Sequence, residues 1–285
     1  MSAPDSSLAT RVQTDLWQHL KRFTPARIAL GRAGGSLPTR EILDFRASHA
    51  LARDAVQAKF NAAGVAADLA GHSVPTIQVA TQARSRAEFL QRPDRGRMLA
   101  TGEEERLSRV PRPVDLVIVV SDGLSALAAH RHAVATLLPL WRAVQVLGWK
   151  VAPVVIAPFA RVKLQDAVGE AMVASFAVML LGERPGLGTP DSLGAYLIAS
   201  PTAGCTDADR NCLSNIRPEG LPPYAAAEKL LWLMQQSRAT GRRGIHLKDT
   251  MAAASLRAAV GRDETKADEL GHPPVSPGAA GTQAP

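Results

Sequence analysis

Four short segments in the second half of the chain are rich in apolar residues, and three of them are nearly continuous apolar runs. They cover residues 114–120 (VDLVIVV), 151–156, 176–181 and 193–199. Strands that are buried on both faces of a sheet have this composition. The residues 124–147 and 163–174 between them have helical periodicity and are long enough for crossover connections. The sequence therefore predicts an α/β fold, a Rossmann-like, doubly wound parallel sheet.

The first ninety or so residues have a different, mainly helical pattern. Residues 8–23 carry apolar side chains at helical spacing, and a second helix is expected from Thr39, as its cap, to Gly64. The stretch 261–285 holds four prolines and four glycines, too little apolar surface for a core. We therefore expect a helical arm over residues 1–26, a smaller helical N-terminal domain over 27–90, the Rossmann-like domain over 91–250 and a disordered tail over 251–285.

Composition, charge and cysteine spacing argue against several classes of function. The net charge of +7 would suit a nucleic-acid-binding module, but the arginines are scattered and aromatic residues make up only 4% of the chain. No apolar window is long enough to span a membrane, and residues 1–23 lack the core of a signal peptide, so we expect a cytosolic protein. Cys205 and Cys212 do not have zinc-site spacing and are expected to be reduced thiols.

Open α/β sheets bind ligands beyond the carboxyl ends of their strands. The segments expected there are residues 121–123, 158–162, 182–188 and 200–223. None of them has the spacing of a dinucleotide fingerprint, a Walker A loop, a G-x-S-x-G elbow or an H-E-x-x-H helix. His130 and His132 lie two positions apart and should point to different faces of a helix, so no metal site is expected there.

Three polar segments remain, and each has a structural and a functional interpretation. Residues 182–188 (GERPGLG) suit a salt-bridged turn or a ligand loop. Residues 207–220 suit an Asp-capped turn with an inert cysteine or a polar site, and Ser121 or Asp122 could cap the following helix. From the residues alone, a stand-alone nucleotide-binding enzyme that uses Ser121, Asp122 and Glu183 remains open.

Together these segments resemble the small subunit of ethanolamine ammonia-lyase. The resemblance is carried, in order, by residues 27–34 (RIALGRAG), 121–125 (SDGLS), 161–163 (RVK), 182–188 and 209–216 (DRNCLSNI). It implies the light chain of a lyase that converts ethanolamine to acetaldehyde and ammonia by radical chemistry. The cofactor implied is adenosylcobalamin, held between a large and a small subunit. The chain has no D-x-H-x-x-G motif, which agrees with a base-on corrinoid.

The resemblance also assigns roles within this chain. By position in the matching motifs, the cofactor contacts are Val162, Glu183 and Cys212, whereas Cys205 is expected to be a plain loop residue. No catalytic residue and no metal ligand are expected on this chain, so the isolated chain should be inactive. The implied partner is the large subunit, in a complex of six large and six small chains. The implied location is the bacterial cytosol, and packaging in a bacterial microcompartment is left open because only about 26 residues precede the first matching motif.

Overall fold

The computed structural model describes residues 12–13 and 15–251. The chain divides into one unit over Met1–Leu247 and a second over Lys248–Pro285, of which residues 248–251 are described. The expected tail therefore lies, apart from its first residue, outside the described residues, as does the start of the helix expected over 8–23. Within the described part of the chain, no helix combines the length and the apolar character that crossing a membrane requires.

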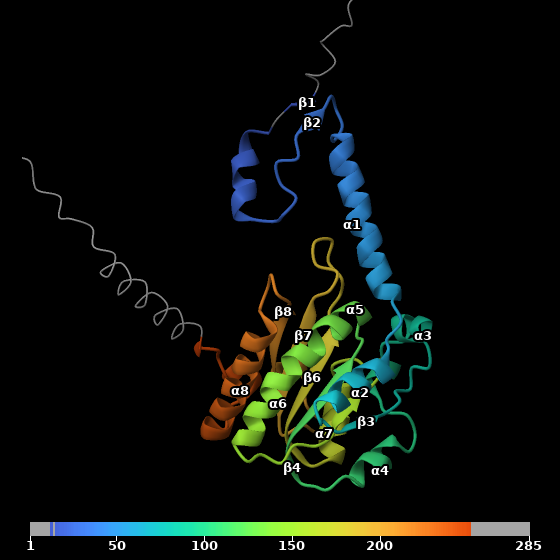
Figure 1. Ribbon diagram of the computed structural model, residues 1–285, viewed down its shortest axis with the longest axis vertical. Helices are drawn as coiled ribbons and strands as arrows, with labels where there is room; N and C mark the ends of the chain where they lie inside the picture. The colour runs from blue at the N-terminus through green and yellow to red at the C-terminus, as the bar shows by residue number, and fades with distance from the viewer. Residues whose placement is uncertain (1–11, 14, 252–285) are drawn as a thin grey trace, which may run out of the picture. The chain divides into compact units, whose positions relative to one another are not determined.

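A six-stranded sheet with the order β3-β5-β4-β6-β7-β8 forms the centre of the first unit (Figure 1). Its strands are β3 (Thr76–Gln78), β4 (Val114–Ser121), β5 (Val154–Ile156), β6 (Ala174–Gly182), β7 (Leu193–Ala199) and β8 (Arg210–Ile216). β3, β5, β4 and β6 run parallel to one another. These observations confirm the α/β prediction and all four predicted strands.

The other edge of the sheet differs from the prediction of parallel strands throughout. β7 is antiparallel to β6, and β8 is antiparallel to β7. Residues 183–192, which join β6 to β7, are too few for the crossover that a parallel connection needs. β8 lies in the segment expected to be a loop. Its sequence, RNCLSNI, has no apolar run, because one face of the strand carries polar groups.

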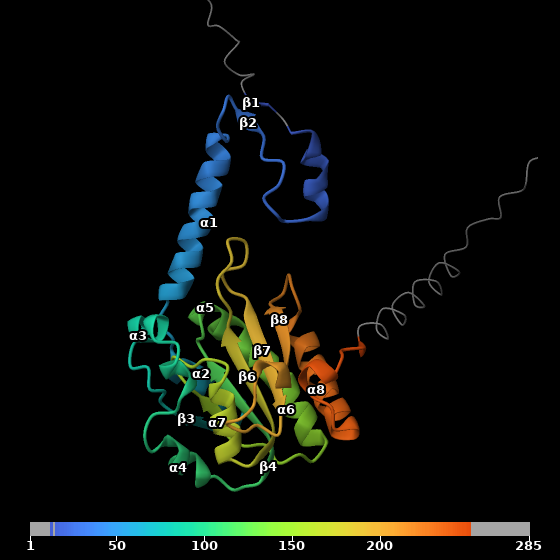
Figure 2. The same cartoon turned by 180° about the vertical axis from the view of Figure 1, so that it is seen from behind.

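Helices cover both faces of the sheet (Figures 1 and 2). The helices α2 (Ala62–Gly71), α6 (Val134–Val146) and α8 (Pro223–Thr240) lie on one face, and α4 (Glu103–Ser108) and α7 (Leu164–Ala171) lie on the other. Alternate residues of β4 supply the two cores: Ile118 and Val120 face the first set, and Val117 and Val119 face the second. The helix predicted over 124–147 is present as α5 (Ala126–Ala128), a π-helical turn (Ala129–Ala133) and α6.

The N-terminal part is mainly helical, as predicted, but its details differ. β1 (Val12–Gln13) pairs with β2 (Arg32–Ala33), and the segment predicted over 8–23 contains a 3-10 helix over Leu16–Phe23. The second predicted helix is split into α1 (Thr39–Gln57) and α2, and α2 begins where the Asn61 side chain accepts the Gly64 N–H. The remaining short helices are α3 (Arg86–Gln91) and 3-10 turns at Arg95–Arg97, Asp207–Asp209 and Gly244–His246.

Candidate functional site

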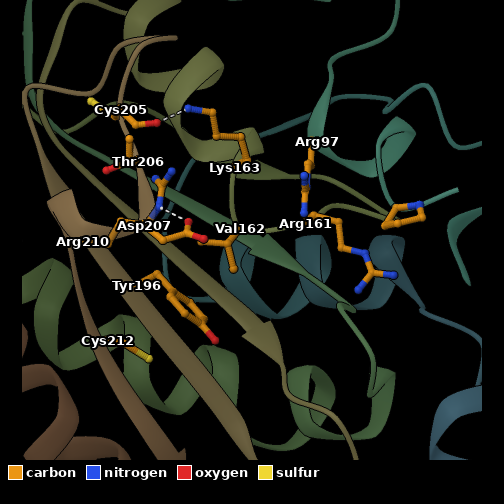
Figure 3. Close-up of a pocket in the computed structure, with 11 residues that line it drawn as sticks. Arg97, Arg161, Val162, Lys163, Tyr196, Cys205, Thr206, Asp207, Arg210 and Cys212 are labelled. Carbon is orange, nitrogen blue, oxygen red and sulfur yellow. Dashed lines mark hydrogen bonds and ion pairs between the residues drawn. The ribbon is translucent and has the colours of Figure 1, made fainter.

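A cavity of about 790 Å³ lies on the face of the sheet that also carries α7. α7 packs against β4 and β6, and beyond it Tyr196 of β7 and Cys212 of β8 are register partners (Figure 3). The cavity is lined by Pro93, Arg97, Arg161, Val162, Lys163, Tyr196, Cys205, Thr206, Asp207, Arg210 and Cys212. The open part of this sheet face therefore forms one wall of a hollow lined by four cationic side chains and one carboxylate.

A second cavity, of about 410 Å³, lies at the carboxyl ends of β4 and β6. It shares Arg161, Val162 and Tyr196 with the first cavity and adds Glu183 and Arg184. Of the three cofactor contacts predicted from the motifs, Val162 lines both cavities, Cys212 lines the first and Glu183 lines the second. The fold thus brings all three to two adjoining cavities.

Glu183 is held by a bulge in β8. Ala195 pairs with Leu213 and Leu193 with Ile216, so that Ser214 and Asn215 together oppose Gly194. The Glu183 carboxylate accepts hydrogen bonds from the Ser214 hydroxyl at 2.5 Å, from the Asn215 N–H at 3.1 Å and from the Ser192 hydroxyl. The bulge therefore fixes the side chain at the mouth of the second cavity.

Cys212 lies within β8 and not beyond a strand end, which corrects its predicted place in the topology. The pKa of its thiol is raised mainly by desolvation, and the charge of Glu183 raises it further, whereas a hydrogen bond with Tyr196 lowers it. The side chain still meets solvent. Cys212 is therefore a neutral thiol at neutral pH, suited to a small contact and poorly suited to nucleophilic attack.

Two residues were not predicted as important and have clear structural roles. Tyr196 lines both cavities, but its strand reads as an ordinary apolar run. Cys205 lies in a loop, as expected, but its side chain is buried in the core on the α7 face, 3.4 Å from the Thr202 hydroxyl, and it also lines the first cavity. The spacing of apolar residues in the loop gives no signal for this burial.

Arg161 lies between the two cavities, directly before Val162. Its Nη2 donates to the Phe89 carbonyl oxygen at 3.0 Å, and its guanidinium lies 4.0 Å from the centre of the Phe89 ring. Its Nε is buried and has no hydrogen-bond partner among the described residues. Desolvation and the nearby guanidinium groups of Arg86, Arg97 and Arg184 lower the pKa of Arg161. The site thus contains a buried donor that the described residues leave unused.

Ser121 and Asp122 are structural residues of the turn after β4. Both are essentially fully buried, at 0% and 1% exposure. The Asp122 carboxylate accepts from the Phe159 N–H at 2.7 Å and pairs with Arg86 at 3.1 Å. Burial raises the pKa of Asp122, although these partners oppose the shift. Neither residue caps the next helix, because Ser125 accepts the Ala128 N–H and takes that role.

A buried ion pair supports the floor of the first cavity. Asp166 of α7 accepts two hydrogen bonds from the Arg210 guanidinium, at 2.5 and 2.9 Å, and the two side chains are 1% and 3% exposed. Lys163 also pairs with Asp166 at 2.9 Å and donates to the Ala203 carbonyl oxygen. It donates to the Cys205 carbonyl oxygen as well (Figure 3). This network joins α7 to the start of β8.

The two histidines of the π-helical turn have separate partners. The Nε2 of His130 accepts the Asn61 N–H at 2.9 Å, and the ring stacks on Phe60. His132 is buried, with its Nε2 3.5 Å from the Asp191 carboxylate. Within residues 12–13 and 15–251, no group of three or more His, Cys, Asp or Glu side chains is placed to hold a metal ion.

Comparison with known proteins identifies the family. A family model described as "Ethanolamine ammonia-lyase light chain (EutC)" matches residues 14–248. The chain belongs to this family. Proteins named ethanolamine ammonia-lyase small subunit are 47% identical in Ralstonia nicotianae (89% of this chain, 95% of the relative) and 45% identical in Pseudomonas fluorescens (91% and 96%). A third, from Bradyrhizobium diazoefficiens, is 48% identical (84% and 92%).

Membership of the ethanolamine ammonia-lyase light chain family confirms the resemblance found in the motifs. The chain is a subunit of a carbon–nitrogen lyase. The family match includes Val162, Glu183 and Cys212, together with every residue that lines the two cavities. A stand-alone nucleotide-binding enzyme is set aside, since Ser121 and Asp122, two of its three proposed site residues, are buried in the turn after β4.

Proposed function

We propose that this chain is the small subunit of an adenosylcobalamin-dependent ethanolamine ammonia-lyase and forms one wall of the corrinoid site. The observation that carries the proposal is the position of Val162, Glu183 and Cys212. The motifs assign these three residues to the cofactor, and they are far apart in the sequence, yet all three line the same pair of adjoining cavities.

The side chains around these cavities suit a corrinoid. Its broad ring offers apolar surface and carries neutral amide groups on its rim, and its nucleotide tail contains a phosphodiester. Val162 and Tyr196 supply apolar contact, and the Glu183 carboxylate has room for a further donor after its three internal hydrogen bonds. The Nε–H of Arg161 is a donor for an acceptor that residues 12–13 and 15–251 do not provide.

The work of this chain would be to bind and orient the cofactor and to exclude water from one side of it. When bound, adenosylcobalamin supplies a radical by homolysis of its cobalt–carbon bond. The residues at the site would not carry out the reaction: Glu183 is tied to Ser192, Ser214 and Asn215, and Cys212 is a neutral thiol. The isolated chain should therefore be inactive toward ethanolamine.

The partner in this proposal is a large subunit. The relatives are named small subunits, and both cavities are open hollows on the surface of this chain, which a second chain would close. The base-on form of the cofactor and a complex of six large and six small chains are carried by the resemblance alone. The same is true of a place in the bacterial cytosol, free or inside a microcompartment.

Co-expression of the two chains tests this function. Corrinoid absorbance is expected to co-purify with the complex, and ethanolamine turnover is expected only when both chains and adenosylcobalamin are present. The isolated small chain, folded by circular dichroism, serves as the control. Turnover by the small chain with adenosylcobalamin alone would contradict the proposal and would support a stand-alone enzyme.

Glu183→Gln is expected to weaken the apparent affinity of the complex for adenosylcobalamin about tenfold. Glutamine keeps one acceptor oxygen but loses a charge-assisted hydrogen bond worth about 1.5 to 3 kcal/mol. The measurement is turnover against cofactor concentration, and the maximal rate should largely recover at saturation. Glu105→Gln, at an exposed position on α4, is the matched control. A maximal rate lowered more than a hundredfold at unchanged cofactor affinity would place Glu183 in the chemistry.

A further inference from the structure

We propose that Arg97, Arg161 and Arg184 form an anion site for the phosphodiester in the nucleotide tail of the corrinoid. This inference rests on the proposed function, and it names the part of the cofactor that these residues would receive. Arg97 lines the first cavity, Arg184 lines the second and Arg161 lines both.

Positive charge is concentrated around Arg161. Together with desolvation, the positive charges of Arg86, Arg97 and Arg184 all lower the pKa of Arg161. The Asp122 carboxylate is the negative group that raises it. Asp122 is already engaged, because it pairs with Arg86 at 3.1 Å and accepts the Phe159 N–H. Like charges repel most strongly where they are partly shielded from water. A bound anion would relieve this repulsion and would be favoured at this place for that reason.

The cations near the cavities divide into committed and available groups. Arg86 donates to the carbonyl oxygens of Val56, Gly123 and Leu124 as well as to Asp122. Lys163 and Arg210 are engaged with Asp166. These three side chains therefore stabilise the fold and have little capacity for a ligand.

The available donors belong to the three proposed residues. The Arg161 Nε is buried and has no partner in the described part of the chain, although its Nη2 donates to Phe89. The side chains of Arg97 and Arg184 are exposed, and neither makes a hydrogen bond or an ion pair with the part of the chain that the structure describes. Arginine is well suited to a phosphate because its planar guanidinium presents several donors in a fixed geometry.

The chemistry of the corrinoid singles out one group for this site. Its rim amides are neutral, and the phosphodiester carries the negative charge of the nucleotide tail. Val162, which is assigned to the cofactor, directly follows Arg161 and lines the same two cavities. Apolar contact with the corrinoid and pairing with its phosphate would then come from consecutive residues at the end of one loop.

Comparison of two corrinoids tests the contact with the phosphate-bearing nucleotide tail. Cyanocobalamin contains the phosphodiester, whereas cyanocobinamide has the same ring without the phosphate, the ribose and the base. Dissociation constants for both are measured by equilibrium dialysis on the complex with the large subunit. Arg97→Met and Arg184→Met are each expected to weaken cyanocobalamin binding about tenfold and to change cyanocobinamide binding less than twofold. Arg142→Met, at an exposed position of α6, should change neither.

Arg161→Met should give the largest selective loss, and its melting temperature is recorded because Arg161 also donates to Phe89. If this variant does not fold, the Arg97→Met and Arg184→Met variants still test the phosphate site. Equal weakening of both corrinoids, or no change in either, would overturn the phosphate site while leaving the proposed function intact. Weaker association with the large subunit, with an unchanged preference for cyanocobalamin, would instead assign the arginines to a carboxylate of the partner. Failure of the wild-type complex to bind either corrinoid would overturn the proposed function itself.

Discussion

Asp166→Ala is expected to lower the free energy of unfolding by about 3 to 5 kcal/mol, because it leaves a buried cation without its partner. Arg210 is 3% exposed, and both of its terminal nitrogens donate to the Asp166 carboxylate, at 2.5 and 2.9 Å. After the substitution, its charge stays in a poorly solvated position at the start of β8. Urea unfolding of the full chain, followed by circular dichroism, measures the loss.

The second partner of Arg210 provides a matched control. Asp207 pairs with the Arg210 Nε at 3.2 Å, but its side chain is 98% exposed. Asp207→Ala should therefore cost less than about 1 kcal/mol. The double variant Asp166→Ala/Arg210→Met should recover part of the stability, since it removes the stranded charge. A loss of under 1 kcal/mol for Asp166→Ala would show that water reaches Arg210 and that the pair does not hold α7 to β8.

Gly182→Ala is expected to destabilise the chain by about 3 kcal/mol or more, because the added methyl group meets backbone atoms that cannot move independently. A Cβ at this position would lie 2.0 Å from the Ser125 carbonyl oxygen and 2.6 Å from that of Asp122. The Gly182 carbonyl oxygen also accepts the Leu124 N–H at 2.8 Å. The turn after β4 and the end of β6 would have to separate, which would displace Glu183 and reduce corrinoid retention by the complex.

Gly188→Ala tests whether this effect is specific to position 182. Gly188 belongs to the same GERPGLG segment, and a Cβ added to it would meet no atom within 4 Å. Its substitution should change the free energy of unfolding by no more than about 0.5 kcal/mol. Thermal melts of both variants, together with corrinoid absorbance of the purified complexes, make the comparison. Similar behaviour of the two variants would contradict the close contact described for Gly182.

The parallel core of the fold could be predicted because its strands are buried on both faces. β4 and β6 read as apolar runs for this reason, and the helices that follow β4 and β5 have the expected period. β8 could not be found in the same way, since it presents Cys212 and Ser214 to the open side of the sheet. The direction of β7 depends on the short connection after Gly182, and the apolar pattern of a strand carries no information about its direction.

The candidate site was only partly predictable. The motifs indicated Val162, Glu183 and Cys212, and the structure places all three at the two cavities. The partners of Glu183 could not be derived, because they depend on an irregularity in a strand that the sequence does not reveal. The burial of Asp122 could not be predicted either, because its ion pair with Arg86 joins residues 36 positions apart.

Because of the bulge in β8, the geometry of the site depends on the number of residues in this strand. Leu213 and Ile216 both belong to the core beneath α6 and α8, although residues three apart in a regular strand point to opposite faces. Deleting one residue at 214 or 215 would restore regular pairing and leave both side chains on the core face, because they would then lie two positions apart, but it would remove the local bend of the strand. The loss would also remove a donor to Glu183. The extra residue of the bulge therefore serves the contact with Glu183 and not the core, and a family member without this residue would have to build this wall of the cavity differently.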